Sequence, residues 1–196
     1  MGRPHRVQKP NLIYHVYSRC INRMNLMKLD KIKDMLIKVI AETQKKYLFE
    51  LNDFEILDNH FHFKIKTVKN GTEISKIMQR IKSVFAKRYN KLMNRTGPFW
   101  NERYASKIIE IIAEKAKDIL TLLFYLFFNA VRKGIVKNPG DYKYSAFNCY
   151  VDKNYKCPLK ITLSDAFLAL GDTFEERSRI FLQYVREFKN KIGARD

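Results

Sequence analysis

Two histidines stand one residue apart in the run DNHFHF at residues 58–63, in a chain that has only four histidines. On a β-strand, residues i and i+2 point to the same face, so His60 and His62 would project together while Phe61 points to the opposite face. Two adjacent imidazoles can share a metal ion, because histidine is the commonest metal ligand in proteins. The pair alone is a weak signal, since many surface pairs bind nothing, and a metal site needs a further ligand.

A second pair of polar residues interrupts the apolar segment LFYLFFNAVRKG at residues 123–134. Tyr125 and Asn129 are four residues apart, which places them on one face of a helix. If this helix packs beside the histidine strand, Asn129 could give its amide oxygen to the same metal, with the Tyr125 phenol one turn earlier. Two imidazoles, an amide oxygen and open positions suit magnesium or manganese. The alternative, that Tyr125 is a core aromatic residue and Asn129 a helix cap, stays open.

The hydrophobic pattern predicts seven elements that would position these residues. Alternating apolar residues indicate strands, and apolar residues spaced by three and four indicate helices. The predicted strands are Leu12–Arg19, Phe54–Leu57, Phe61–Thr67 and Tyr104–Ile112, and the predicted helices are Asp30–Tyr47, Thr72–Met93 and Ala113–Lys133. The order β-α-β-β-α-β-α is that of the ferredoxin-like, RRM-like α+β fold, an antiparallel sheet with helices on one face, plus an additional helix.

Smaller signals complete the predicted fold. Asp30 is expected to cap its helix, and Asp58 with Asn59 to form a turn between two strands. His15, on the first strand, is interpreted as structural or solvent-facing rather than as a ligand. Beyond a tyrosine-rich loop that ends near residue 159, we expect helices over residues 162–170 and 173–192.

The charge of the chain points to a polyanionic partner. Lys and Arg number 38 against 20 Asp and Glu, a net charge of +18, which favours nucleic acid over an anionic membrane. No acidic residue occurs from residue 74 to 101, so the second helix has a basic face. Trp100 could stack on an unpaired base or anchor the core. The candidate DNA contacts are Arg3, Arg6, Lys76, Arg80, Lys87, Arg88, Trp100 and Arg103.

The remaining composition predicts a cytoplasmic, nucleoid-associated protein without a membrane segment. The start of the chain lacks an apolar signal region, and the longest apolar run, at residues 119–128, is too short to span a bilayer. Cys20, Cys149 and Cys157 show no CxxC spacing, so neither a disulfide framework nor a zinc site is indicated.

The residues above resemble a known set. The run NHFHF resembles the His-hydrophobic-His motif of the HUH nucleases, and the later segments resemble their single-tyrosine transposases, in particular the REP-associated tyrosine transposases and other IS200-like transposases. Three elements carry this resemblance, over about residues 12–150, and Ala130, Tyr144 and Ala146 depart from the usual pattern. The matching residues are Gly97, Trp100, Arg103 and Tyr104; Tyr125, Asn129, Val131 and Gly134; and Asp141, Tyr142 and Ser145.

This resemblance implies a metal-dependent single-stranded DNA endonuclease and strand transferase, with a nuclease domain at residues 1–150 and a helical C-terminal extension at residues 151–196. Tyr125 would be the nucleophile, on a catalytic helix, and would form a 5′-phosphotyrosine link beside a DNA hairpin. His60 and His62 would be catalytic and, with Asn129, would bind magnesium or manganese. The protein would act as a monomer or homodimer.

Two other interpretations remain. The same element order serves non-catalytic RRM-like domains, whose sheet aromatics stack bases, although no RNP-type motif occurs on the predicted strands. A replication or plasmid-transfer nickase of the HUH class is the other. Relaxases of that class usually have a third histidine in the motif, where this chain has Phe63.

Overall fold

A four-stranded antiparallel sheet organises the molecule. The computed structural model describes residues 9–109 and 116–193. The strands are β1 (Ile13–Arg19), β2 (Glu50–Ile56), β3 (His60–Lys66) and β4 (Ala105–Ile109), in the spatial order β2-β3-β1-β4. Every neighbouring pair is antiparallel. This arrangement confirms the predicted α+β fold.

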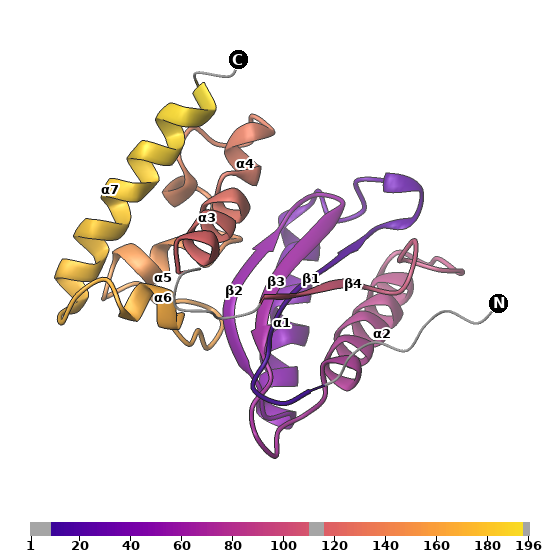
Figure 1. Cartoon of the computed structure of the whole chain (residues 1–196). Coiled ribbons are helices and arrows are strands. Elements are labelled where there is room, and N and C mark those ends of the chain that lie inside the picture. The colour runs from indigo at the N-terminus through magenta and orange to yellow at the C-terminus, as the bar shows by residue number, and fades with distance from the viewer. Residues whose placement is uncertain (1–8, 110–115, 194–196) are drawn as a thin grey trace.

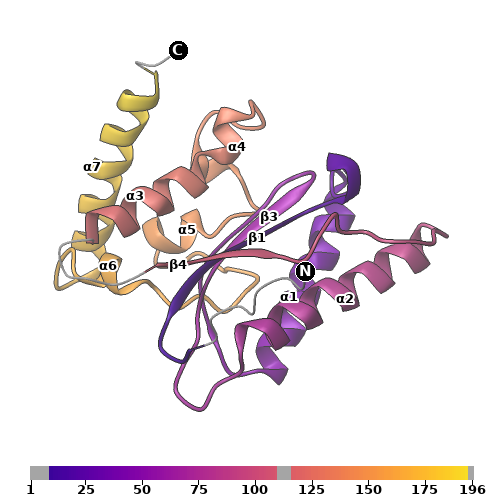
Figure 2. The same cartoon turned by 45° about the vertical axis from the view of Figure 1, so that its right-hand side comes forward.

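Two long helices cover one face of the sheet, α1 (Asp30–Lys46) and α2 (Ile74–Leu92), as Figures 1 and 2 show. Because side chains alternate along a strand, one set of strand residues points at these helices. That set is buried and apolar, and it meets the apolar stripes of the two helices. The sheet residues are Tyr14, Val16, Phe54, Ile56, Phe61, Phe63 and Ile65.

The later part of the chain packs on the opposite face, beside the β2 edge (Figure 1). It comprises α3 (Ala116–Phe127), α4 (Asn129–Arg132), α5 (Phe147–Val151), α6 (Asp165–Leu168) and α7 (Phe174–Gly193). Two short 3-10 helices, Ile21–Arg23 and Pro139–Asp141, lie in the loops.

The segment before α5 extends the hydrogen bonding of β2. The Ile56 N–H donates to the Tyr144 carbonyl at 2.9 Å, and the Ala146 N–H donates to the Phe54 carbonyl at 3.0 Å. The Tyr142 hydroxyl donates to the Ile56 carbonyl at 2.6 Å. These bonds fix the C-terminal helices against the sheet. The ring of Tyr150 in α5 also stacks on Phe181 of α7, with 5.5 Å between the ring centroids.

Several predicted boundaries were wrong. β2 begins at Glu50, four residues before the prediction, because buried polar residues hide its alternation. Leu29, not Asp30, is the cap residue of α1. The predicted helix 113–133 is divided at Phe128 into α3 and α4, its first residues lie outside the described part, and α5 was expected to be loop. Residues 110–112 of the fourth predicted strand also lie outside the described residues.

Candidate catalytic and metal centre

The face of the sheet turned away from α1 and α2 carries polar side chains in two cross-strand rows. In one row, His62 of β3 lies between Glu55 of β2 and Tyr17 of β1. In the other, Lys64 of β3 lies between Asp53 of β2 and His15 of β1. Strand pairing thus brings residues of β1 beside residues of β3 that lie more than forty positions later in the sequence.

His60 and His62 share this face, as their spacing predicts. Their ring centroids are 5.0 Å apart and the rings are nearly perpendicular, at 86°. Nδ1 of His60 is 2.6 Å from Oδ1 of Asn59, and Nδ1 of His62 is 3.0 Å from Nε2 of His15. Both Nδ1 atoms are therefore engaged within the protein, which leaves Nε2 of each ring as the atom for an external ligand.

Both histidines are electrically neutral at neutral pH. Burial, with a smaller effect from the nearby cations Lys133 and Arg19, lowers the pKa of His60 to about 4. Burial also holds the pKa of His62 well below its usual 6.5, together with the neighbouring His60 and His15. A metal can bind only the unprotonated imidazole, so this environment favours metal binding.

Asn129 joins the histidine strand through Glu55. It is buried at the start of α4, and its amide Nδ2 donates to Oε2 of Glu55 at 2.8 Å. The Ala130 N–H donates to the other carboxyl oxygen at 3.3 Å. Because Glu55 is the cross-strand neighbour of His62, these bonds place Asn129 one residue away from the strand position of His62. Burial raises the pKa of Glu55 to about 8, and the bond from Asn129 opposes that shift.

Tyr125 lies one turn before Asn129, and its side chain is 48% exposed. The alternative interpretation of Tyr125 as a core aromatic residue is therefore wrong. The Arg132 guanidinium stacks on its ring, 3.9 Å from the centroid, and donates to the Tyr125 main-chain carbonyl at 2.8 Å. Arg132 also donates to Oδ1 of Asn129. One cation thus connects the predicted nucleophile to the predicted third ligand.

These residues fit a hard divalent ion with open positions. Two Nε2 atoms and the Asn129 oxygen would give a mixed N/O set, in which the amide oxygen is the ligand type that suits magnesium and manganese. A carbonyl oxygen has two lone pairs, so the Arg132 bond leaves one for a metal. Within the described part of the chain, no group of three or more His, Cys, Asp or Glu is arranged as a metal site. The amide is what would complete the set.

The second row holds a buried pair of opposite charge. Asp53 and Lys64 are fully buried cross-strand neighbours, and among the described residues neither Nζ nor the two carboxyl oxygens have a hydrogen-bond partner. Burial raises the pKa of Asp53 to about 7 and lowers that of Lys64 to about 8. The pair lies beside His15, the residue bonded to His62.

The predicted basic face of α2 lies on the far side of the sheet from the histidines (Figure 1). Lys76 and Lys87 are exposed and Arg80 is half-buried. Arg88 forms a two-pronged ion pair with Glu42 of α1, at 2.7 and 2.9 Å, so its charge is already matched. Arg3 and Arg6 lie outside the described residues.

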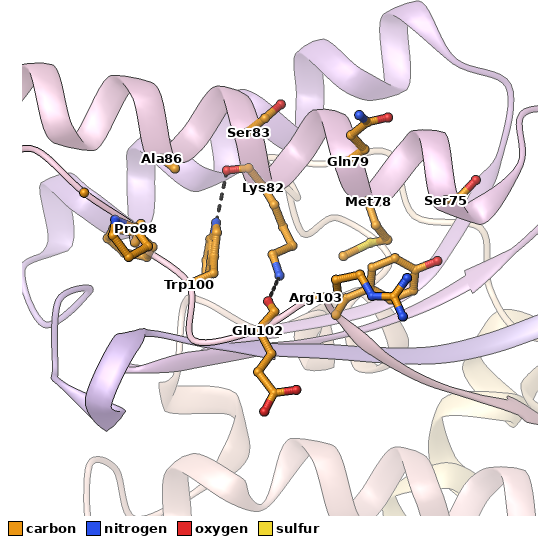
Figure 3. A pocket seen from close by; sticks show the side chains of 13 residues that line it. Ser75, Met78, Gln79, Lys82, Ser83, Ala86, Pro98, Trp100, Glu102 and Arg103 are labelled. Carbon is orange, nitrogen blue, oxygen red and sulfur yellow. Dashed lines mark hydrogen bonds between the residues drawn. The ribbon is translucent and has the colours of Figure 1, made fainter. Parts of the chain in front are cut away.

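Trp100 has both a core contact and an accessible side. Its ring packs against Phe61, Phe85 and Phe99, and its N–H donates to the Lys82 carbonyl at 3.0 Å. It also lines a cavity of about 600 Å³ between α2 and residues 97–104, together with exposed Arg103 (Figure 3). Both interpretations of Trp100 therefore have structural support.

Sequence reasoning missed several residues on the histidine face. Glu55 and the His15 bond were not predicted, although alternation along β2 and β1 places both on this side. Three exposed cations also surround the site: Arg19 at the end of β1, Lys107 on β4 opposite His15, and Lys133 after α4. Arg19 and Lys133 lie close enough to lower the pKa of both motif histidines.

The fold and the histidine strand agree with the transposase class that the sequence resembles. The model of one family, described as "Transposase IS200 like", matches residues 8–119, more than half of the chain. The chain belongs to the IS200-like transposase family. The matched segment contains His60 and His62 and ends before Tyr125 and Asn129.

One solved structure supports the same fold. A REP-associated tyrosine transposase bound to a REP hairpin is 20% identical, covers 84% of this chain and 94% of its own, and has a TM-score of 0.63. A transposase structure from Deinococcus radiodurans is 16% identical over 63% of this chain and 94% of its own, with a TM-score of 0.36, too low to bear on the fold. No curated protein matches the chain. None of the described helices has the length and apolar character needed to cross a membrane.

Proposed function

We propose that this protein is a metal-dependent single-stranded DNA transposase that cuts and rejoins DNA beside a hairpin through Tyr125. The observation that carries the proposal is the chain of contacts from Tyr125 through Arg132, Asn129 and Glu55 to the strand position of His62. A merely structural tyrosine would not need to be half exposed within an otherwise buried run.

In the proposed reaction, the Tyr125 phenolic oxygen attacks a backbone phosphorus. A bond forms between this oxygen and phosphorus, and the bond from phosphorus to the 3′-oxygen breaks. The phenol loses its proton and the departing 3′-oxygen gains one, which leaves a 5′-phosphotyrosine and a free 3′-hydroxyl. Attack by another 3′-hydroxyl reverses these changes and joins new ends, because the covalent link conserves the bond energy.

A neutral phenol is a weak nucleophile, so the reaction needs charge stabilisation at the phosphate. His60, His62 and Asn129 would hold a magnesium or manganese ion, which supplies Lewis-acid polarisation of the phosphate when bound. Arg132, stacked on the Tyr125 ring, holds the ring in place and brings a second positive charge to the same location.

The DNA would contact both faces of the protein. On the histidine face, Arg19, Lys107 and Lys133 would bind phosphates near the cut. On the other face, Trp100 and Arg103 would engage an unpaired base and its phosphate at the cavity in Figure 3. Lys76, Arg80 and Lys87 would extend that path, with a smaller role for the paired Arg88. The hairpin ligand of the similar solved structure supports a stem-loop substrate for this chain as well.

The proposal is tested by incubating the protein with end-labelled hairpin DNA that carries single-stranded flanks, in manganese, and resolving the products on a denaturing gel. We expect a covalent protein–DNA adduct for the wild type and none for Tyr125→Phe or His60→Ala. Tyr17→Phe is the matched control, because Tyr17 is also exposed and its ring lies 5.7 Å from His62.

Loss of the adduct in Tyr17→Phe but not in Tyr125→Phe would transfer the nucleophile to β1. Salt-sensitive hairpin binding without an adduct, across several hairpins and metals, would instead favour the non-catalytic nucleic-acid-binding interpretation.

A further inference from the structure

We propose that every predicted metal ligand is oriented by a fixed hydrogen-bond acceptor, and that these three acceptors are positioning residues of the centre. The inference rests on the proposed function, because it requires the predicted ligands to be the actual ones. Each acceptor takes the N–H that the ligand does not need, and so turns the ligating atom outward. The pairs are Asn59 with His60, His15 with His62, and Glu55 with Asn129.

The first pair defines the His60 tautomer. The Asn59 amide is itself oriented, since its Nδ2 donates to the Arg23 carbonyl at 3.0 Å. Its Oδ1 therefore faces Nδ1 of His60, at 2.6 Å, and a carbonyl oxygen can only accept. A neutral imidazole has one N–H, so the proton lies on Nδ1 and the lone pair lies on Nε2.

The second pair makes the same choice for His62. Nδ1 of His62 and Nε2 of His15 are 3.0 Å apart, and the rings are stacked within 25°. If His15 donated, His62 would carry its proton on Nε2 and could not bind a metal there. If His62 donates, Nε2 is free. We assign the second arrangement, in which His15 acts as the acceptor, as acceptors on ligating histidines usually do.

The third pair selects oxygen over nitrogen on Asn129. Glu55 receives two donors, the Asn129 amide and the Ala130 N–H, one on each carboxyl oxygen. Both oxygens accept in this arrangement, so the amide nitrogen faces Glu55 and Oδ1 faces away from it, on the side of Arg132. Oδ1 is the only atom of this side chain that can bind a metal.

Histidine tautomers in the metal-free full-length protein test the first two pairs directly. Long-range proton–nitrogen NMR correlations distinguish Nδ1–H from Nε2–H. We expect His60 and His62 both to be protonated on Nδ1. In His15→Leu, His62 loses its acceptor and should shift partly to Nε2–H, while His60 does not change. A wild-type Nε2–H tautomer at either histidine would overturn the inference.

Manganese affinity without DNA tests the second and third pairs. We expect His15→Leu and Glu55→Gln to weaken Mn²⁺ binding by about tenfold or more, as loss of such partners does at other metal sites. Glu55→Gln is the sharper change, because a glutamine has one acceptor oxygen for two donors, and its amide would turn Oδ1 of Asn129 inward. Tyr17→Phe, on the same strand as His15, is the control and should bind as the wild type does.

The outcomes separate this inference from the proposed function. Variant-sensitive Mn²⁺ binding without any DNA adduct would contradict the proposed function and keep the positioning roles. Equal affinity in all folded variants, or no Mn²⁺ binding by the wild type, would overturn the positioning roles. Where Glu55→Gln does not fold, as judged by circular dichroism, the His62 tautomer in His15→Leu decides.

Discussion

The two faces of the sheet are built from the same strands and have opposite chemistry. On the side of α1 and α2, β3 presents Phe61 and Phe63, both fully buried in the core. On the other side, the residues between and beside them are His60, His62 and Lys64. Core residues and candidate site residues thus alternate along β3.

The polar face is not a solvated surface. Glu55, Asp53 and Lys64 are as buried as the phenylalanines opposite, because the segment that precedes α5, together with α4, packs over β2. Burying charge costs free energy unless it is paired. The apolar face therefore stabilises the fold, and the buried charges of the polar face destabilise it. The following changes test that division, beginning with the largest expected effect.

Truncating a side chain on the core face should cause the largest loss of stability. Phe63→Ala removes a fully buried ring that stacks on Phe61 with centroids 4.2 Å apart. We expect the free energy of unfolding to fall by about 4 kcal/mol, from lost burial and the resulting cavity. Denaturant unfolding measures this. Phe63→Leu should cost much less, and an equal loss for both would contradict a packing origin.

Breaking the buried charge pair should cause the next largest loss of stability. Lys64→Met leaves the Asp53 carboxyl buried without its cation, and we expect a loss of about 3 kcal/mol. In the double variant with Asp53→Asn, most of that loss should be recovered, since no charge remains to be paired. A double-mutant cycle by denaturant unfolding gives the coupling. Additive losses would show that the two charges do not interact.

Acid should weaken the histidine face. The folded pKa of His60, about 4, lies below its usual 6.5, so the unfolded chain binds more protons between these values. Stability from this group is complete above pH 6.5 and is lost as pH falls toward 4. We compare the free energies of unfolding of metal-free His60→Gln and wild type. From neutral pH to about pH 5, this difference should shift by about 2 kcal/mol in favour of His60→Gln. A pH-independent difference, measured by chemical unfolding in a chelator, would contradict the lowered pKa.

Tyr125→Phe should have the smallest effect on stability. The side chain is half exposed, and phenylalanine keeps the ring under Arg132. We expect a change within about 0.5 kcal/mol by denaturant unfolding, as for other surface substitutions. A loss of 2 kcal/mol would indicate a structural hydroxyl and weaken the case for a nucleophile.

The sequence predicted the core face well and the polar face in part. Local sequence pattern is enough to recognise the apolar alternation of β1 and β3 and the apolar stripes of α1 and α2. These elements predicted the fold. β2 was shortened because Asn52, Asp53 and Glu55 look like loop residues until a partner buries them. The same burial hides Glu55 from any motif search.

Contacts between distant segments could not be predicted from local pattern. The Asn129 and Tyr125 spacing followed from helical geometry, but the bond to Glu55 depends on how α4 docks on β2. His15 was interpreted without its partner, because strand register decides which histidine it meets. Arg88 was assigned to DNA because its ion pair with Glu42 joins two helices that are distant in sequence, so local pattern does not reveal it.

The most direct test of the account is to identify the residue that carries the DNA. The adduct formed with hairpin DNA and manganese would be digested with protease and nuclease, and the nucleotide-linked peptide sequenced by mass spectrometry. We predict a single modified peptide, with the 5′-phosphate of the cleaved strand on Tyr125. A nucleotide on Tyr17, Tyr104 or any other residue would contradict it.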